Sequence, residues 1–160
     1  MLALAGRAAD GVLISAATSP AFITWTLAQA AVGAAGRERP VRRIALVCAA
    51  VDDVAEHAHA RLRRRLGFVL RGPHHAMNLR LAGSSLDQTA LAEAYAREDW
   101  AQVQTLVSDD VVRRHAASGT PADVRHMFDA YSAIGLDEIV LSGFRDGNDV
   151  AAILSAARGE

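Results

Sequence analysis

Apolar residues along this chain fall into short continuous runs separated by segments with helical spacing. The continuous runs lie at residues 12–14, 43–51 and 139–141, and such runs are typical of parallel strands that are buried on both faces. Between them, apolar residues recur every three or four positions, as on one face of an amphipathic helix. Together these patterns predict an α/β protein with three parallel strands covered by helices.

The clearest helix start lies at Thr120. Thr120 is a good N-cap residue, Pro121 suits the first helical turn, and Asp123 completes an acidic capping box. Gly135 marks the end of this helix, and the last apolar run follows it directly. An earlier helix begins in a similar way at Ser19. Local residues alone therefore indicate where two of the helices start.

The pattern of strands stops between residues 71 and 117. Gly72 and Pro73 end a helix that Asp52 or Asp53 is expected to cap, and only short helical patches follow. We therefore expect a single domain over residues 1–160 with a helical insertion at 71–117. The first residues look like the last turns of a helix, so the chain is expected to start inside an element.

Composition and charge exclude several classes of function. The formal net charge is -1, all 17 basic residues are Arg, and charges of both signs are mixed along the chain. This distribution predicts no nucleic-acid partner and no membrane-surface patch. No window approaches the roughly 20 apolar residues of a membrane span, and the first residues lack the features of a secretion signal. A cytoplasmic protein is expected, with Cys48 as a buried structural thiol.

The histidines do not have the spacing of a metal site. His74 and His75 are adjacent and His57 and His59 are two apart, so neither pair shares one face of a helix. We therefore expect no metal. Imidazole titrates near neutral pH, which makes His75 and His115 the candidates for general acid–base catalysis.

Several segments taken together resemble a known family. Residues 4–14, 18–20, 119–124 and 135–141, in this order and spacing, resemble the carboxyl-terminal half of the bacterial luciferase-like oxidoreductases, in the branch of the methylene-tetrahydromethanopterin reductases. The resemblance implies a partial (β/α)8 TIM barrel that contains about the last three strands, with the helical insertion between the second and third of them. It also implies an oxidoreductase (monooxygenase or reductase) that uses FMN or a deazaflavin coenzyme of the F420 type and acts on a small-molecule substrate.

Candidate contact residues lie at the carboxyl ends of the predicted strands and at the helix start that follows the helical insertion. The candidates for cofactor binding are Ser15, Ala16, Ala17, Thr18, Gly119 and Thr120. Both groups precede a helix, where free N–H groups and the helix dipole favour a phosphate or carboxylate. In the alternative interpretation each helix simply caps itself, through Ser19 or through the Thr120 capping box. Ser142 and Arg145 are candidates for a substrate or anion contact, although Arg145 also fits a solvated loop.

Three strands cannot close a barrel, and an open sheet has two edges with unpaired backbone groups. We therefore expect a homo-oligomer, a partner that supplies the missing barrel half, or a truncated chain, and no full activity of this chain alone. The alternative is a non-catalytic remnant or interaction module of the same fold that pairs through its exposed sheet edges.

Overall fold

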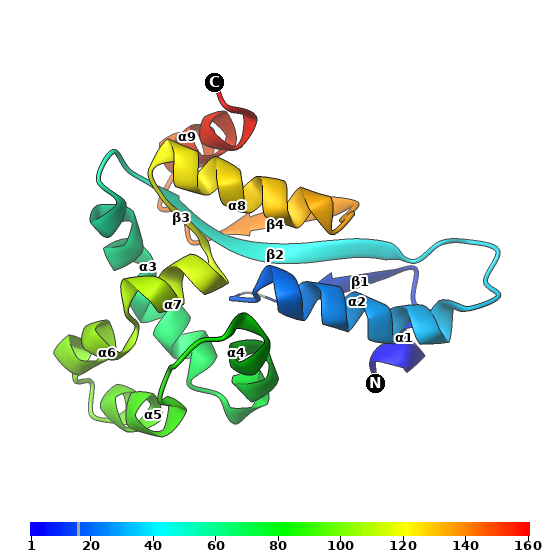
Figure 1. Cartoon of the computed structure of the whole chain (residues 1–160), viewed down its shortest axis with the longest axis horizontal. Helices are drawn as coiled ribbons and strands as arrows, with labels where there is room; N and C mark the ends of the chain where they lie inside the picture. The colour runs from blue at the N-terminus through cyan, green and yellow to red at the C-terminus, as the bar shows by residue number, and fades with distance from the viewer. Residues whose placement is uncertain (16) are drawn as a thin grey trace.

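A parallel sheet forms the centre of the computed structural model, which describes residues 1–15 and 17–160 (Figure 1). The strands are β1 (Gly11–Ile14), β2 (Arg42–Val51), β3 (Ala117–Gly119) and β4 (Glu138–Ser142). The helices are α1 (Leu2–Ala8), α2 (Pro20–Ala34), α3 (Ala55–Leu70), the 3₁₀ helix η1 (Pro73–His75), α4 (Ala76–Ala82), α5 (Gln88–Ala96), α6 (Trp100–Leu106), α7 (Asp109–His115), α8 (Pro121–Ala133) and α9 (Gly147–Arg158).

Strand β2 is the longest strand, and the other three pair with it in parallel. Strand β1 pairs with its first half, with Ile14 opposite Ala45, and β4 pairs with its middle, with Cys48 opposite Ser142. The sheet is not closed, because in the described part of the chain β1 and β4 each have a strand on one side only. The predicted α/β class and parallel strand arrangement are therefore confirmed.

The sheet contains a short strand that the sequence pattern did not predict. Strand β3 pairs with Ala49–Val51 at the carboxyl end of β2, and Asp52 N donates a hydrogen bond of 3.1 Å to Gly119 O. Its three residues are too few and too small to give an apolar run. The helices of the insertion consequently end at His115, and the residue expected to close the insertion, Ala117, belongs to the sheet.

The two faces of β2 bury their side chains in different cores. Ala45, Val47 and Ala49 pack with apolar residues of α2, α8 and α9, whereas Cys48 and Ala50 pack with residues of α3 to α7. Alternation along a strand places these sets on opposite faces. Cys48 is fully buried and unpaired with another cysteine, as the sequence predicted.

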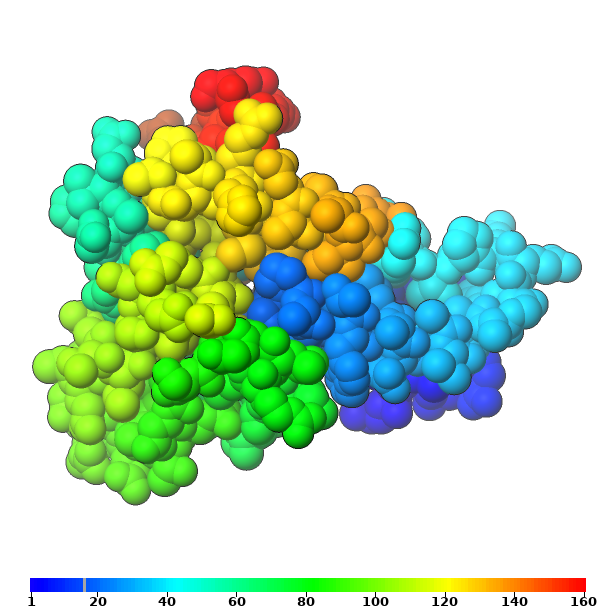
Figure 2. Space-filling view, in the orientation of Figure 1, coloured from blue at the N-terminus to red at the C-terminus, as the bar shows by residue number. Residues whose placement is uncertain are grey.

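The face of the sheet that packs against α3 to α7 is covered only near the carboxyl end of β2. Figure 2 shows the helices of the insertion as a lobe next to α2 and α8. Beside the amino-terminal part of β2, Leu13 of β1 keeps 58% of its surface exposed, while its neighbours Val12 and Ile14 are buried on the other face. A sheet with helices on one face and an uncovered strip on the other is the arrangement of a barrel segment whose interior side is open.

Local capping signals are confirmed for two helices and wrong for a third. Ser19 caps α2, and Thr120 with Asp123 forms the full capping box of α8. Helix α3 instead begins after Val54, with no side-chain cap. Asp52, which was expected to cap it, accepts a hydrogen bond from Val54 N (3.2 Å) before the helix begins.

Candidate functional site

The loop after β1 lies at the carboxyl end of the sheet and contains a strained residue. Ala17 is fully buried and has a φ of 59°, a left-handed conformation that residues other than glycine rarely adopt. Such strain persists only where the surroundings hold the backbone firmly, and it is frequent at functional sites. Ala16, which was predicted to be part of the same contact, lies outside the described residues.

Asn78 lies on helix α4 of the insertion and binds the loop after β1. Its side chain is fully buried. Its Oδ1 accepts hydrogen bonds from Ser19 N and Ser19 Oγ, both at 3.1 Å, and its Nδ2 donates to Ala17 O at 2.7 Å. Because a backbone carbonyl only accepts, the amide nitrogen must face Ala17, which fixes the orientation of the side chain. One amide therefore joins the β1 loop, the start of α2 and the insertion.

His115 of helix α7 contacts the same carbonyl. Its Nδ1 lies 3.1 Å from Ala17 O and its Nε2 lies 2.7 Å from Ser84 Oγ. Burial lowers the pKa of His115 to about 4, so the ring is neutral at neutral pH. Nδ1 then carries the proton and donates to Ala17, and Nε2 accepts from Ser84. Both ring nitrogens of this predicted acid–base candidate are thus engaged in hydrogen bonds within the protein.

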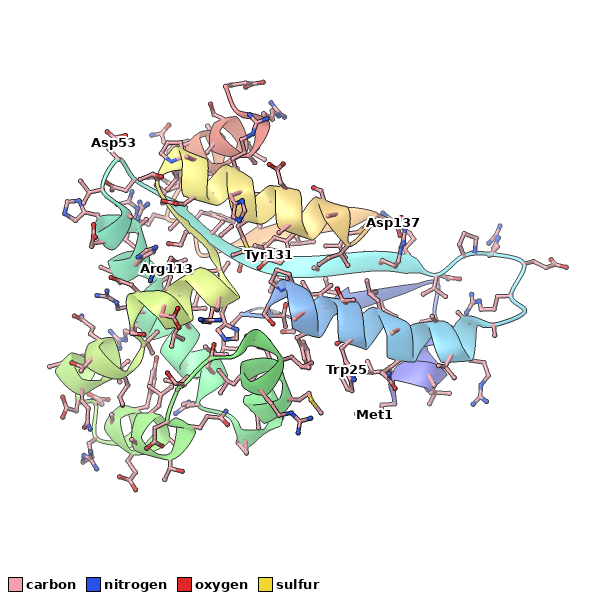
Figure 3. The ribbon with its side chains drawn as sticks, in the orientation of Figure 1. Met1, Trp25, Asp53, Arg113, Tyr131 and Asp137 are labelled. Carbon is pink, nitrogen blue, oxygen red and sulfur yellow. The ribbon has the colours of Figure 1, made fainter. Side chains whose placement is uncertain are left out.

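Tyr131 of helix α8 completes the set of contacts to the loop. Its hydroxyl donates a 3.2 Å hydrogen bond to Thr18 O, and burial raises the pKa of this phenol. Figure 3 shows Tyr131 projecting from α8 in the region where α8 approaches the start of α2. The Thr18 hydroxyl itself is buried and has no hydrogen-bond partner among the described residues, as is the case for the hydroxyl of Ser118. Three helices therefore fix the backbone of Ala17 and Thr18.

The predicted contacts at Gly119 and Thr120 lie at the start of α8. Thr120 Oγ1 donates to Asp123 Oδ2 at 2.6 Å, and Thr120 N donates to the same oxygen at 2.9 Å. These bonds lower the pKa of Asp123, so a carboxylate already occupies this helix start. Gly119 has a φ of 136°, and a Cβ there would come within 2.7 Å of Asp123 Oδ2. The geometry is that of the self-capping alternative.

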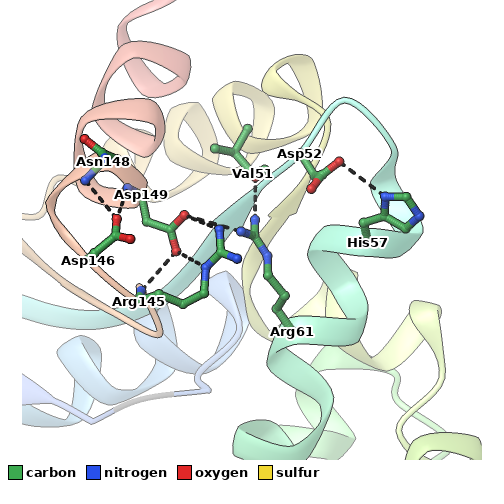
Figure 4. A network of polar contacts seen from close by, with 8 residues as sticks. All are labelled: Val51, Asp52, His57, Arg61, Arg145, Asp146, Asn148 and Asp149. Carbon is green, nitrogen blue, oxygen red and sulfur yellow. Dashed lines mark hydrogen bonds and ion pairs between the residues drawn. The ribbon is translucent and has the colours of Figure 1, made fainter.

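Ser142 and Arg145 also have partners within the chain. Ser142 Oγ lies 3.5 Å from Cys48 Sγ and donates to Val47 O at 3.4 Å. The Arg145 guanidinium binds Asp149 through Nε (2.9 Å) and a terminal nitrogen (2.7 Å), as Figure 4 shows. This pairing holds the pKa of Asp149 well below its usual range. Arg145 therefore binds a carboxylate in the first turn of α9.

The structure places Ala17 and Thr18 in one set of contacts at the carboxyl end of the sheet, and it gives Thr120 and Arg145 partners close in sequence. Ala17 and Cys48 belong to one core cluster, and Cys48 contacts Ser142, so the β1 loop and the end of β4 lie across β2 from each other. His75 lies on η1, is partly buried, and has its pKa lowered by burial and by His74.

No group of three or more His, Cys, Asp and Glu side chains in residues 1–15 and 17–160 has the arrangement of a metal site. None of the helices in the same ranges is long and apolar enough to cross a lipid bilayer.

A sequence model of the luciferase-like monooxygenase family matches residues 1–138. The chain belongs to this family. Among similar curated proteins, the 5,10-methylenetetrahydromethanopterin reductases of Archaeoglobus fulgidus and Methanolobus tindarius are 29% and 31% identical over 147 residues. Each match covers 88% of this chain and 44% of the relative. The chain therefore spans less than half the length of these two relatives.

Solved structures show the same fold. The coenzyme F420 dependent tetrahydromethanopterin reductase from Methanopyrus kandleri superposes with a TM-score of 0.81 at 23% identity, over 98% of this chain and 46% of that chain. An F420-dependent secondary alcohol dehydrogenase superposes with a TM-score of 0.66 at 17% identity, over 98% and 44%. The family and the partial-barrel fold expected from the sequence are confirmed.

Proposed function

We propose that this chain forms the carboxyl-terminal part of a luciferase-like oxidoreductase that uses a deazaflavin coenzyme of the F420 type and reduces or oxidises a small-molecule substrate. The names of the similar proteins support this coenzyme over FMN, since two solved relatives are F420-dependent. The proposal rests on one structural observation above all, the strained β1 loop held by Asn78, His115 and Tyr131 at the carboxyl ends of the strands.

The residues at this end of the sheet suit a bound coenzyme. Active sites of barrels are built at the carboxyl ends of the strands, and the buried hydroxyls of Thr18 and Ser118 lack partners in the described part of the chain. Polar groups left unpaired in a buried position are unusual enough to need an explanation. A coenzyme that changes the local packing would give these hydroxyls hydrogen-bond partners.

In this proposal the coenzyme, when bound, supplies hydride transfer, and the protein supplies position. Asn78, His115 and Tyr131 hold the carbonyls of Ala17 and Thr18, so that the backbone after β1 keeps one conformation. His115 is a positioning residue here, because its two nitrogens are already used. His75 stays the candidate for proton transfer, since its ring lies in an open pocket.

Replacing Tyr131 with phenylalanine tests whether the loop serves coenzyme binding. The change removes the hydrogen bond to Thr18 O, which is worth about 1 kcal/mol and corresponds to about a fivefold weaker affinity for F420. Binding is measured by fluorescence titration of F420 and of FMN, with the chain alone and with a co-expressed polypeptide that supplies the remaining barrel strands.

Thr105→Val is the matched control, because Thr105 also donates to a backbone carbonyl, that of Ala101, but on helix α6 of the insertion and at an exposed position. F420 affinity should be unchanged in this variant. Failure of both forms of the protein to bind F420, or a preference for FMN, would refute the proposed coenzyme.

A second function is supported by the open sheet. Strands β1 and β4 each have one edge without a neighbouring strand in the described part, and Leu13 is exposed on the uncovered face. Unpaired edges favour association with another chain. An interaction module, a homo-oligomer or a complex with a chain that contains the other strands would use these surfaces.

Sedimentation velocity tests the association of the exposed edges. We expect the purified chain to sediment as a dimer or larger species, and Leu13→Lys to shift it towards the monomer because a charge would be buried in the contact. Val32→Lys serves as the control, since Val32 is also exposed but lies on helix α2. A stable monomer of the unmodified chain would argue against the interaction module.

A further inference from the structure

A pocket of about 370 Å³ lies between the carboxyl end of β1 and the beginning of the insertion. Ser15 contributes from the β1 side, and the remaining wall comes from the end of α3 and from η1. The polar and aromatic groups of the wall are Ser15, Phe68, Arg71, His74 and His75. No acidic side chain of the described residues lines this pocket.

Arg71 is held by aromatic rings rather than by a carboxylate. Its Cζ lies 4.8 Å from the ring centroid of Phe68 and 4.6 Å from that of Tyr95, and its Nε donates to Phe68 O at 3.2 Å. None of the Asp and Glu side chains in residues 1–15 and 17–160 is within ion-pair distance of it. Stacking fixes the plane of the guanidinium and leaves its terminal N–H groups free for a ligand.

The turn that contains the two histidines is fixed in place as well. Gln88 Nε2 donates to Leu70 O at 2.7 Å and to Gly72 O at 2.8 Å. A Cβ at Gly72 would approach His74 Cε1 to 2.4 Å, so the absence of a side chain lets the imidazole of His74 lie against the backbone. The rings of His74 and His75 have centroids 4.4 Å apart. The pocket wall is therefore a fixed arrangement of donors.

We propose that this pocket binds an anionic group, a phosphate or a carboxylate, with Arg71 as its main charge partner and Ser15, His74 and His75 as further donors. A planar guanidinium matches the two oxygens of such a group. The inference rests on the proposed function only for the origin of the anion, which is either the substrate or the coenzyme. Either origin places a charged end of the ligand beside the β1 loop.

The inference is tested by titrating the chain with inorganic phosphate and following ¹H–¹⁵N spectra. We expect saturable shifts of the Arg71 Nε–H signal and of the amides of Gly72 and His75. Arg71→Gln should weaken phosphate binding about tenfold or more, as expected for the loss of a charge-assisted hydrogen bond. His74→Asn with His75→Asn should weaken it less, because the Arg71 charge remains.

Arg65→Gln is the matched control, since Arg65 is an exposed arginine on the same helix α3 and does not line the pocket. Its phosphate affinity should equal that of the unmodified chain. Equal binding by the Arg71→Gln variant, shifts centred on another part of the surface, or no saturable shift at all would each overturn the inference. Well-dispersed spectra of the variants show that they remain folded.

The origin of the anion is decided by repeating the comparison with F420. A tenfold loss of F420 affinity in Arg71→Gln assigns the pocket to the anionic part of the coenzyme. Unchanged F420 affinity together with weakened phosphate binding assigns it to the substrate. Since the phosphate titration does not depend on F420, absence of coenzyme binding would refute the proposed function and leave the anion site standing.

Discussion

Replacing Asn78 with alanine is expected to lower the free energy of unfolding by about 3 kcal/mol, which is about 1 kcal/mol for each hydrogen bond lost in a buried network. The side chain is fully buried and makes three hydrogen bonds, two with Ser19 and one with Ala17. Alanine would leave the buried Ser19 N–H without this acceptor and weaken the hold on the Ala17 carbonyl. Because Ala17 is strained, the loop would also be free to leave its left-handed conformation.

The measurement is equilibrium unfolding in urea, with Asn148→Ala as the control. Asn148 is exposed at the start of α9, where its backbone N–H, and not its side chain, donates to Asp146 Oδ1, so its replacement should cost little. Asn78→Asp refines the test, since it keeps the acceptor for Ser19 but places a second acceptor against Ala17 O. If Asn78→Ala were as stable as Asn148→Ala, the β1 loop would not depend on this amide.

The sequence predicts those elements whose signals are local. The cap residue Ser19 and the Thr120–Asp123 box lie within three residues of the groups they bind, and both are present in the structure. The three apolar runs are strands for a similar reason, because each is continuous and bounded by turns.

The candidate site depends on contacts that no local pattern encodes. Asn78 binds a residue 59 positions earlier, and Tyr131 binds one 113 positions earlier. Nothing in the neighbourhood of either residue names its partner, because the partner is set by how distant segments pack. Strand β3 is missed for the same reason, since it exists only through pairing with the end of β2. The one indication of this site in the sequence is the polar residue Asn78 between the apolar residues Met77 and Leu79.

Acidification from about pH 6.5 to about pH 4 is expected to remove about 3 kcal/mol of stability through His115. Burial lowers the pKa of this imidazole from 6.5 to about 4 in the folded chain, so above pH 6.5 the ring is neutral in both states and no stability is lost. Below that pH the unfolded chain binds a proton that the folded chain does not, and stability falls until the folded ring also titrates. His75, whose pKa is lowered too, acts in the same direction.

The pH range of the decline, from about 6.5 to about 4, separates the effect of His115 from that of the carboxylates. The pKa values of Asp123 and Asp149 are lowered in the folded chain, so their contribution is present above the ordinary carboxylate pKa and is lost only as the pH falls further. His115→Asn keeps a donor to Ala17 O but cannot bind a proton, so it should flatten the decline between these pH values. His126→Asn, on the exposed face of α8, should leave it unchanged. A decline that persists in His115→Asn would show that another group causes it.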